Sequence, residues 1–296
     1  MSNKKHNHYV PKAYLKGWET LDGKQLGSKS FSVLDLKSQK IRVPDKKRLF
    51  ASIEYLYSIN NEVGIDQHYE NFFCDGESYF GQVLASLSRG SIPSLDGKGW
   101  YYFIESIVSM GLRDPRLINS SLEAFSKALK LPIDNYLKDI VLDILCKQIQ
   151  STVYKFSDFP ISIFKLASHN LITCEVPFWD MSTSKFKKNC GMIPLSSNYL
   201  LVIGDEFDFI KDINLDQKVL NIVDISTDNE KTTILTAMVN NFILARARKW
   251  VVFSNKIDLK TRAHILDELK YEKVLARKLS DKFCVVVGDE RILISD

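Results

Sequence analysis

Bulky apolar residues recur three or four positions apart through the middle of the chain. Phe72, Phe73 and Phe80, for example, fall on one face of a predicted helix, and polar residues occupy the other face. The Gly and Pro residues of 90–93 are typical of the end of a helix. Such stripes predict four helices in succession, at residues 66–89, 100–112, 120–131 and, opened by Pro132, 132–149.

Short runs of β-branched and aromatic residues flank this helical part on both sides, with the length and composition of strands. Strands are predicted at residues 31–36, 40–43, 54–59, 164–172, 191–203, 220–225, 249–253 and 283–287, with further helices at 229–248 and 259–270. The chain has no Gly/Ser-rich linker and no internal repeat. We therefore expect one α+β domain over residues 1–296, in which N-terminal strands (1–60) and C-terminal strands (160–296) form an antiparallel or mixed sheet beside a central helical layer (64–156).

Composition excludes several classes of protein. The chain has 296 residues, of which 45% are hydrophobic and 26% are charged, as in ordinary globular proteins. A disordered tail protein, a collagen-like repeat and a small disulfide scaffold are excluded. The net charge is only +4, from 40 basic and 36 acidic residues. So small an excess neither indicates nor excludes a nucleic-acid partner, because the distribution of charge matters more than its total.

The sequence predicts a cytoplasmic protein without a membrane-spanning segment. The first eleven residues are polar, and no run approaches the roughly 18 apolar residues that cross a bilayer. The five cysteines are scattered and form no Cys-x-x-Cys pair, so we expect free thiols rather than a structural zinc site.

Common catalytic and nucleotide-binding motifs are absent from the sequence. There is no Gly-x-Gly-x-x-Gly fingerprint, no His-Glu-x-x-His helix and no Gly-x-Ser-x-Gly elbow. The segment 23–30 resembles a phosphate-binding loop, but Ser28 separates Gly27 from Lys29. We interpret it as a turn.

The densest chemistry lies at the N-terminus, where His6, His8 and Tyr9 stand among lysines. Imidazole can transfer protons near neutral pH or bind a metal, whereas a frayed terminus would give these residues no role. Basic clusters at 46–48, 185–188 and 246–249 could contact phosphate groups or simply be solvated loops.

The segment His8-Tyr9-Val10-Pro11-Lys12-Ala13-Tyr14-Leu15 resembles the N-terminus of the bacterial domain-of-unknown-function 4238 family, which reads HHYVPxFYL, with Ala13 in place of the usual aromatic residue. Six further pieces resemble the family in the same order: Tyr57; Glu70 and Glu77; Arg113-Asp114-Pro115; the segment 171–177; Ile193-Pro194-Leu195-Ser196; and Asn240 or Asn241 with Ala245 and Arg246. The resemblance covers the whole chain but implies no particular activity.

The chain departs from the family pattern in the segment 171–177, where the usual family sequence is FITSDNP. Here Cys174-Glu175-Val176 replaces Ser-Asp-Asn. Glu175 keeps a carboxylate on a longer side chain, whereas Val176 has no hydrogen-bonding side chain. A site that depends on that asparagine would be incomplete in this chain.

The resemblance places the N-terminal motif against a group of carboxylates and a guanidinium. Glu70 and Glu77 are seven residues apart and so lie on one helix face. As a first hypothesis, the protein is a hydrolase acting on a phosphodiester or nucleotide, such as a nuclease or a toxin or defence effector. The candidate catalytic residues are His8, Tyr9, Glu70, Glu77, Arg113 and Glu175.

In this hypothesis His8 is a general base or metal ligand, Glu70 and Glu175 are metal ligands or orienting groups, and Arg113 clamps a phosphate. A divalent metal cofactor would be held by His8, Glu70 and Glu175. The second hypothesis is a non-catalytic binding or partner protein, in which the same residues lock the N-terminal arm to the fold. An open cleft at these residues would favour the enzyme, and a buried network would favour the scaffold.

Overall fold

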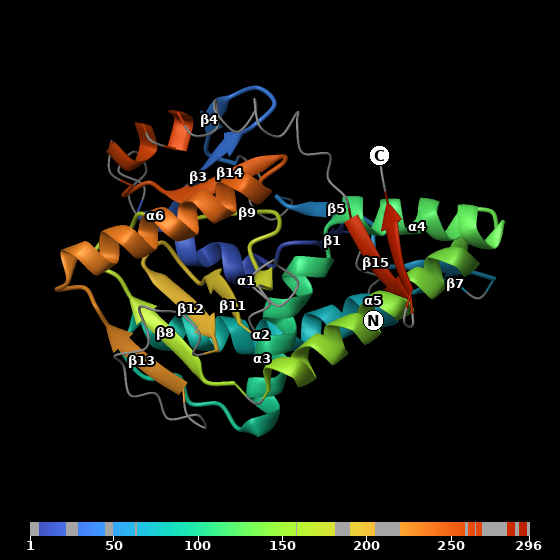
Figure 1. Ribbon diagram of the computed structural model, residues 1–296, viewed down its shortest axis with the longest axis horizontal. Coiled ribbons are helices and arrows are strands. Elements are labelled where there is room, and N and C mark those ends of the chain that lie inside the picture. Colours follow the sequence, from blue (N-terminus) through green and yellow to red (C-terminus); the bar gives the residue numbers. More distant parts are fainter. Residues whose placement is uncertain are drawn as a thin grey trace.

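The computed structural model describes residues 6–21, 29–44, 50–62, 64–157, 159–180, 190–204, 220–257, 260–263 and 265–267, and the backbone of a hairpin, β15 (Phe283–Val287) with β16 (Glu290–Ile294). The fold is α+β, as the sequence predicts: helices and two larger sheets lie side by side (Figure 1).

Aspartates set the starts of the long helices. Asp96, Asp114, Asp134 and Asp228 each accept a hydrogen bond from a backbone N–H of the first turn. The third predicted helix therefore begins earlier, at Pro115, and the fourth begins later than Pro132, at Asn135. The helices are α1 (Lys12–Leu15), a 3-10 turn η1 (Lys16–Trp18), α2 (His68–Ser88), α3 (Gly97–Leu112), α4 (Pro115–Leu129), α5 (Asn135–Phe156) and α6 (Asn229–Arg246).

Strands from the two ends of the chain share one sheet, which confirms that expectation. Its order is β2 (Thr20–Leu21), β3 (Lys29–Asp35), β14 (Trp250–Ser254) and β9 (Ile172–Cys174), and β4 (Lys40–Arg42) also pairs with β3. β14 is antiparallel to both β3 and β9, with Val251 opposite Leu34 and Cys174.

The second sheet is mixed. Its order is β10 (Trp179–Asp180), β11 (Gly191–Pro194), β12 (Tyr199–Ile203), β8 (Ile161–Lys165) and β13 (Leu220–Asp224). β13 is parallel to β8, and the other pairs are antiparallel. Two small ladders pair β1 (His6–His8) with β5 (Ser52–Glu54) and β6 (Ile59–Asn61) with β7 (Gly64–Asp66).

Three strand predictions are wrong in detail, because apolar runs continue through buried turns. The run 54–59 contains a turn at 55–57, where Tyr55 adopts a φ of 54°. The run 164–172 leaves β8 after Lys165 and rejoins a sheet at Ile172, and 191–203 is a hairpin with a turn at 195–198. Leu166, Leu171 and Leu195 lie in these connections and are fully buried.

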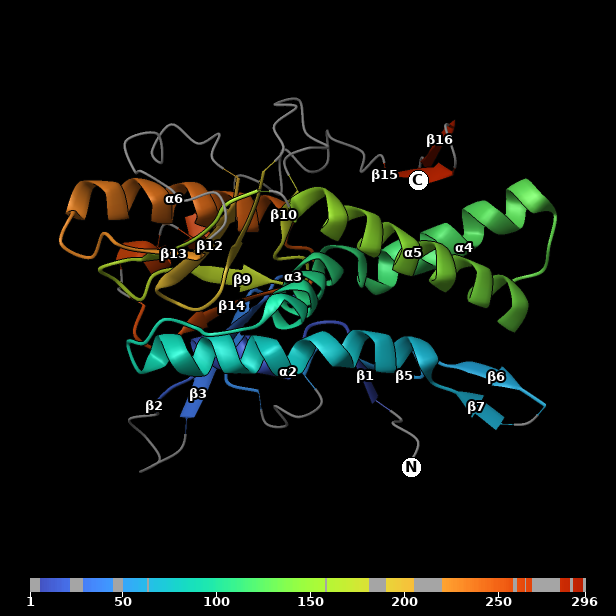
Figure 2. The same cartoon turned by 90° about the horizontal axis from the view of Figure 1, so that it is seen from below.

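The N-terminal motif is part of the core rather than a frayed end. Tyr14 and Trp18 are completely buried. The Tyr14 hydroxyl lies 2.6 Å from Thr173 Oγ1, and Trp18 Nε1 donates to the backbone oxygen of Leu171 at 2.9 Å. Seen from below, α2 runs along the length of the molecule with α3 close to it (Figure 2). The motif thus ties α1 to β9, which carries the segment leading to Glu175.

Candidate functional site

Arg113, at the end of α3, is the centre of a buried polar group. Its Nη2 donates to the backbone oxygen of His8 at 2.5 Å and to Glu77 Oε1 at 3.1 Å. Its guanidinium carbon lies 4.6 Å from the ring centre of Phe73 and 5.5 Å from that of Tyr57. Arg113 is only 1% exposed. The arginine therefore joins strand β1, helix α2 and the 55–57 turn from inside the fold.

Tyr57 and Glu70 complete this group. The Tyr57 hydroxyl donates to the backbone oxygen of Arg113 at 3.2 Å, and its backbone N–H donates to Asn7 Oδ1 at 3.1 Å. Burial raises the pKa of Tyr57. Glu70 is 4% exposed, and its Oε1 accepts from the Cys74 thiol at 3.4 Å. We call His8, Tyr57, Glu70, Glu77 and Arg113 the Arg113 cluster.

Glu175 belongs to a second group, formed with Arg116 of α4 and the backbone of residues 248–249. Its Oε1 accepts hydrogen bonds from the backbone N–H groups of Arg248 and Lys249, at 2.6 and 2.8 Å. Arg116 Nη2 lies 3.7 Å from the same oxygen. Burial raises the pKa of this carboxyl, which is 1% exposed, although these hydrogen bonds and Arg116 oppose the shift. Its second oxygen, Oε2, is buried and has no hydrogen-bond partner among the described residues.

Asp114 and Tyr9 link the two groups. Asp114 caps α4, and its Oδ2 also accepts hydrogen bonds from Arg116 Nε at 3.0 Å and from Arg116 Nη2 at 2.5 Å. The Tyr9 hydroxyl accepts from Trp250 Nε1 at 3.4 Å, and Lys249 Nζ lies 5.7 Å from the Tyr9 ring centre. Burial raises the pKa of Tyr9, and the negative charge of Glu175 acts in the same direction.

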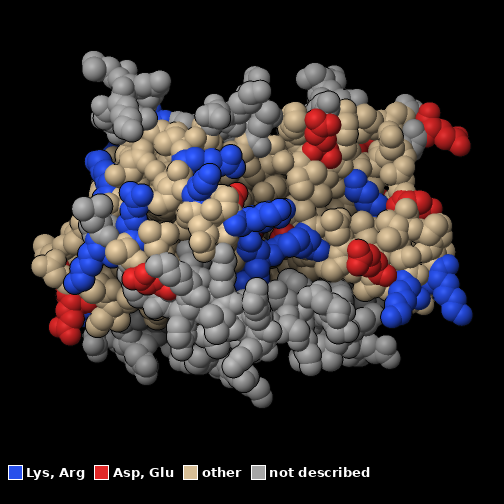
Figure 3. All heavy atoms as spheres, turned by 90° about the horizontal axis from the view of Figure 1, so that it is seen from above, with Lys and Arg blue, Asp and Glu red and all other residues tan. Residues whose placement is uncertain are grey.

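Four basic residues lie at or near the two carboxylates of Asp114 and Glu175. The Arg116 side chain pairs with both, Arg248 and Lys249 donate backbone N–H groups to Glu175, and Arg246 interacts electrostatically with Asp114. We call these four residues the cation group: Arg116, Arg246, Arg248 and Lys249. Seen from above, Lys and Arg side chains gather near the middle of the molecule around a small area of carboxylate (Figure 3). Burial lowers the pKa of Arg246, and the like charges of Arg248 and Arg116 add to this effect. An anion bound above the group would relieve that repulsion.

The structure brings together some of the predicted site residues and separates others. His8, Glu70, Glu77 and Arg113 meet, but His8 contributes its backbone oxygen to Arg113. Tyr9 and Glu175 lie with the cation group instead. Within the described ranges, no three His, Cys, Asp or Glu side chains lie close enough together to hold a metal ion.

Sequence reasoning named Asp114 only as part of the Arg113-Asp114-Pro115 motif and missed Arg116 and Trp250 altogether. The Asp-Pro pair at 114–115 is a typical helix start, and that signal could have placed Arg116 in the first turn of α4, next to Arg113. Of the three predicted basic clusters, 246–249 lies in the cation group. The clusters at 46–48 and 185–188 lie outside the described residues.

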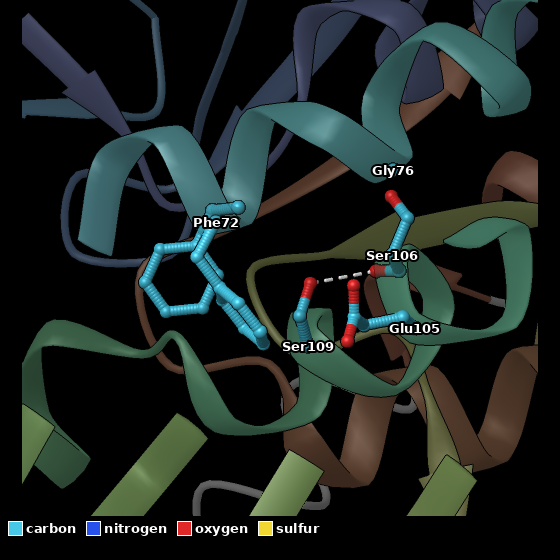
Figure 4. Close-up of a pocket in the computed structure, with 6 residues that line it drawn as sticks. Phe72, Gly76, Glu105, Ser106 and Ser109 are labelled. Atoms are coloured by element: carbon cyan, nitrogen blue, oxygen red, sulfur yellow. Dashed lines mark hydrogen bonds between the residues drawn. The ribbon is translucent and has the colours of Figure 1, made fainter. Parts of the chain in front are cut away.

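A separate recess between α2 and α3 is also lined by polar groups. Glu105, Ser106 and Ser109 of α3 face Phe72 and Gly76 of α2, and the Ser109 hydroxyl donates to the Ser106 backbone oxygen at 2.8 Å (Figure 4). Burial raises the pKa of Glu105 to about 7, and the charge of Asp75 adds to this. The recess has no room for a water molecule, so we assign it no ligand.

Comparison of the chain with curated proteins, solved structures and protein-family profiles shows a match to a family profile. No curated protein and no solved structure gives a significant match to this chain. No helix among the described residues is long and apolar enough to span a membrane. The sequence profile of one family, described as "Protein of unknown function (DUF4238)", matches residues 6–257. These residues include the N-terminal motif, the Arg113 cluster and the cation group, and the chain therefore belongs to the DUF4238 family.

Proposed function

We propose that the protein binds a phosphate-bearing ligand, a nucleotide or nucleic acid, at the cation group. The observation that carries this proposal is that basic residues from two distant segments meet around Glu175. Arg116 Nη2 lies 3.7 Å from Glu175 Oε1, and the backbone N–H groups of Arg248 and Lys249 donate to the same oxygen. Arg246 Nε donates to the backbone oxygen of Val176, the residue after Glu175. Arginine and lysine at such a surface contact phosphate oxygens through charge-assisted hydrogen bonds. Arg248 and Lys249 are exposed, and Arg116 and Arg246 are partly exposed, so the ligand reaches them from solvent.

The Arg113 cluster has a structural part in this proposal. Arg113 and Glu70 are buried, and their contacts tie the N-terminal arm to α2 and α3. A phosphate clamp needs a guanidinium that the ligand can reach, which a side chain 1% exposed does not offer. The buried network favours the non-catalytic binding protein of the second hypothesis, with the arm held in place so that Tyr9 supports Lys249.

Binding of a fluorescently labelled oligonucleotide at several salt concentrations tests the proposal. Replacing both Arg248 and Lys249 by Gln removes two charges but leaves the backbone hydrogen bonds to Glu175 intact. We expect weaker binding, and a slope of log affinity against log salt smaller by about 1.4 for two lost phosphate contacts on a single strand.

The matched control replaces Lys147 and Lys231 by Gln, which changes the net charge equally. Both lysines are exposed and pair with an aspartate on their own helix or at its start. Equal losses in the two double variants would indicate unspecific attraction to a basic protein, and an unchanged affinity after the Arg248 and Lys249 substitutions would refute the proposal.

A second candidate function is hydrolysis of the bound phosphodiester, as the first hypothesis has it. Glu175 favours it, because burial raises the pKa of this carboxyl and its buried Oε2 has no hydrogen-bond partner among the described residues. A ligand that draws the partly exposed Arg116 away from Glu175 would uncover a group suited to proton transfer. Cleavage of the labelled oligonucleotide, with and without Mg²⁺, tests this function. If it holds, Glu175→Gln abolishes cleavage while the oligonucleotide still binds; absence of cleavage by the wild-type protein under both conditions would refute it.

A further inference from the structure

A pair of stacked aromatic rings borders the cation group. The rings of Trp179, in β10, and Phe242, in α6, have centres 4.1 Å apart and planes within 10° of parallel. Both residues are partly exposed. Their neighbour Phe178 packs very differently, edge-on against Phe156 at 88°, and these two rings are 3% and 1% exposed. The Trp179–Phe242 pair is therefore an aromatic surface at the edge of the core, not a part of its interior.

Arg246 connects this pair to the cation group. Its guanidinium carbon lies 5.4 Å from the Phe242 ring centre, while its Nε donates to the backbone oxygen of Val176 at 3.3 Å. Val176 directly follows Glu175, and Trp179 comes three residues later, so one short segment carries the carboxylate, the arginine contact and the aromatic ring. Any phosphate held by Arg246 would have its sugar and base within reach of the stacked rings.

The two features together define the chemistry of the ligand. Cations next to an aromatic stack are the arrangement by which proteins hold the backbone of a single strand and stack its bases. Both faces of a base inside a duplex are already covered by neighbouring base pairs, so only an unpaired base can stack on a protein ring. We propose that the Trp179–Phe242 pair stacks an unpaired base of a single-stranded nucleic acid whose phosphates lie on the cation group; this inference rests on the proposed function.

The chain offers a matched aromatic pair elsewhere. Tyr79 and Tyr102 are also partly exposed and within 9° of parallel, with centres 5.8 Å apart, and Lys98 Nζ lies 5.6 Å from the Tyr102 ring centre. This pair has an aromatic stack and one cation but does not adjoin the cation group. Tyr102→Leu therefore controls for the loss of a surface ring.

The experiment compares the affinity of the full-length protein for a labelled oligothymidylate with its affinity for an abasic strand of the same length. The two strands carry the same phosphates, and only the first has bases. We expect the wild-type protein to bind oligothymidylate at least about fivefold more tightly, since one stacked base contributes that much or more. Trp179→Leu should remove this preference, whereas Trp179→Phe and Tyr102→Leu should keep it.

Four other results would overturn the stacking inference, and one of them would overturn the proposed function as well. Equal affinity of the wild-type protein for both strands would overturn the stacking inference and leave the proposed phosphate binding intact. A preference for bases that survives both Trp179→Leu and Phe242→Leu would overturn it too, by placing the bases elsewhere. Tighter binding of a duplex than of the single strand would contradict the unpaired base, and no binding of any strand would overturn the proposed function together with the inference.

Discussion

Arg113 of α3 and Glu77 of α2 form an ion pair, with Nη2 and Oε1 3.1 Å apart, in which the arginine is 1% exposed and the glutamate 22%. Removing one partner of such a pair leaves the other charge without its desolvated contact. We expect Arg113→Met to lower the free energy of unfolding by about 3 kcal/mol, measured by urea denaturation.

The control for this substitution is Lys147→Met, which breaks an exposed pair with Asp143 on α5. It should change the free energy of unfolding by less than about 0.5 kcal/mol. If Arg113→Met is as stable as the wild type but no longer binds the oligonucleotide, the phosphate-clamp role of Arg113 is supported and its structural role is wrong.

Helical periodicity in the sequence predicts part of the Arg113 cluster. Helical periodicity places Glu70 and Glu77 on one face, and the end of an apolar stripe places Arg113 at a helix end. No pattern shows that the backbone oxygen of His8, rather than its imidazole, meets the guanidinium. That contact depends on how β1 pairs with β5, which is a tertiary property.

In the candidate site, too, the sequence indicates the residues but not the contacts between them. Glu175 and the 246–249 cluster stand out in the sequence, but their contact results from pairing between β9 and β14, which brings residues more than seventy positions apart together. Strand boundaries predicted from apolar runs are also wrong, because Leu171 and Leu195 are buried in connections and not in strands. Periodicity reports burial, and here burial extends beyond regular structure.

Gly76 allows α2 and α3 to approach closely. A Cβ atom at this position would lie 2.5 Å from the backbone oxygen of Tyr102 and 2.9 Å from Ser106 Cβ. Gly76→Ala therefore forces the helices apart, and we expect a loss of about 1–3 kcal/mol in the free energy of unfolding.

Gly81, on the same helix, is the contrasting position. Its added Cβ would meet only Ala13 Cβ, at 4.0 Å. Because glycine inside a helix is less favourable than alanine, Gly81→Ala should stabilise the protein by about 0.5–1 kcal/mol. Chemical denaturation of the two variants in parallel tests the contrast, and a similar change in both would rule out the tight helix contact.

Glu105 should make stability depend on pH. Burial raises the pKa of this carboxyl from 4.5 to about 7, and it is 4% exposed. Between pH 4.5 and 7 the folded protein binds more protons at this group than the unfolded chain does, so its contribution to stability falls as pH rises. Glu105→Gln cannot ionise and should be more stable than the wild type at pH 8, by about 1–3 kcal/mol.

Unfolding free energies of the two proteins across pH 4 to 8 measure this difference, in which the titration of all other groups cancels. Glu123→Gln, at an exposed position of α4, is the control for the loss of one surface carboxylate. A constant difference between Glu105→Gln and the wild type over this range would exclude the raised pKa.

Tyr14 and Thr173 join the N-terminal motif to β9 through a buried contact between their hydroxyls, 2.6 Å apart. Tyr14→Phe leaves the Thr173 hydroxyl without this partner, and Thr173→Val does the same to the tyrosine. We expect each single variant to lose about 1–3 kcal/mol. The double variant removes both polar groups and should lose less than the sum, with a coupling of about 0.5–3 kcal/mol in a double-mutant cycle. Strictly additive losses would mean that the two hydroxyls do not interact, and the polar attachment of the motif next to β9 would then rest on the hydrogen bond from Trp18 Nε1 to the Leu171 backbone oxygen.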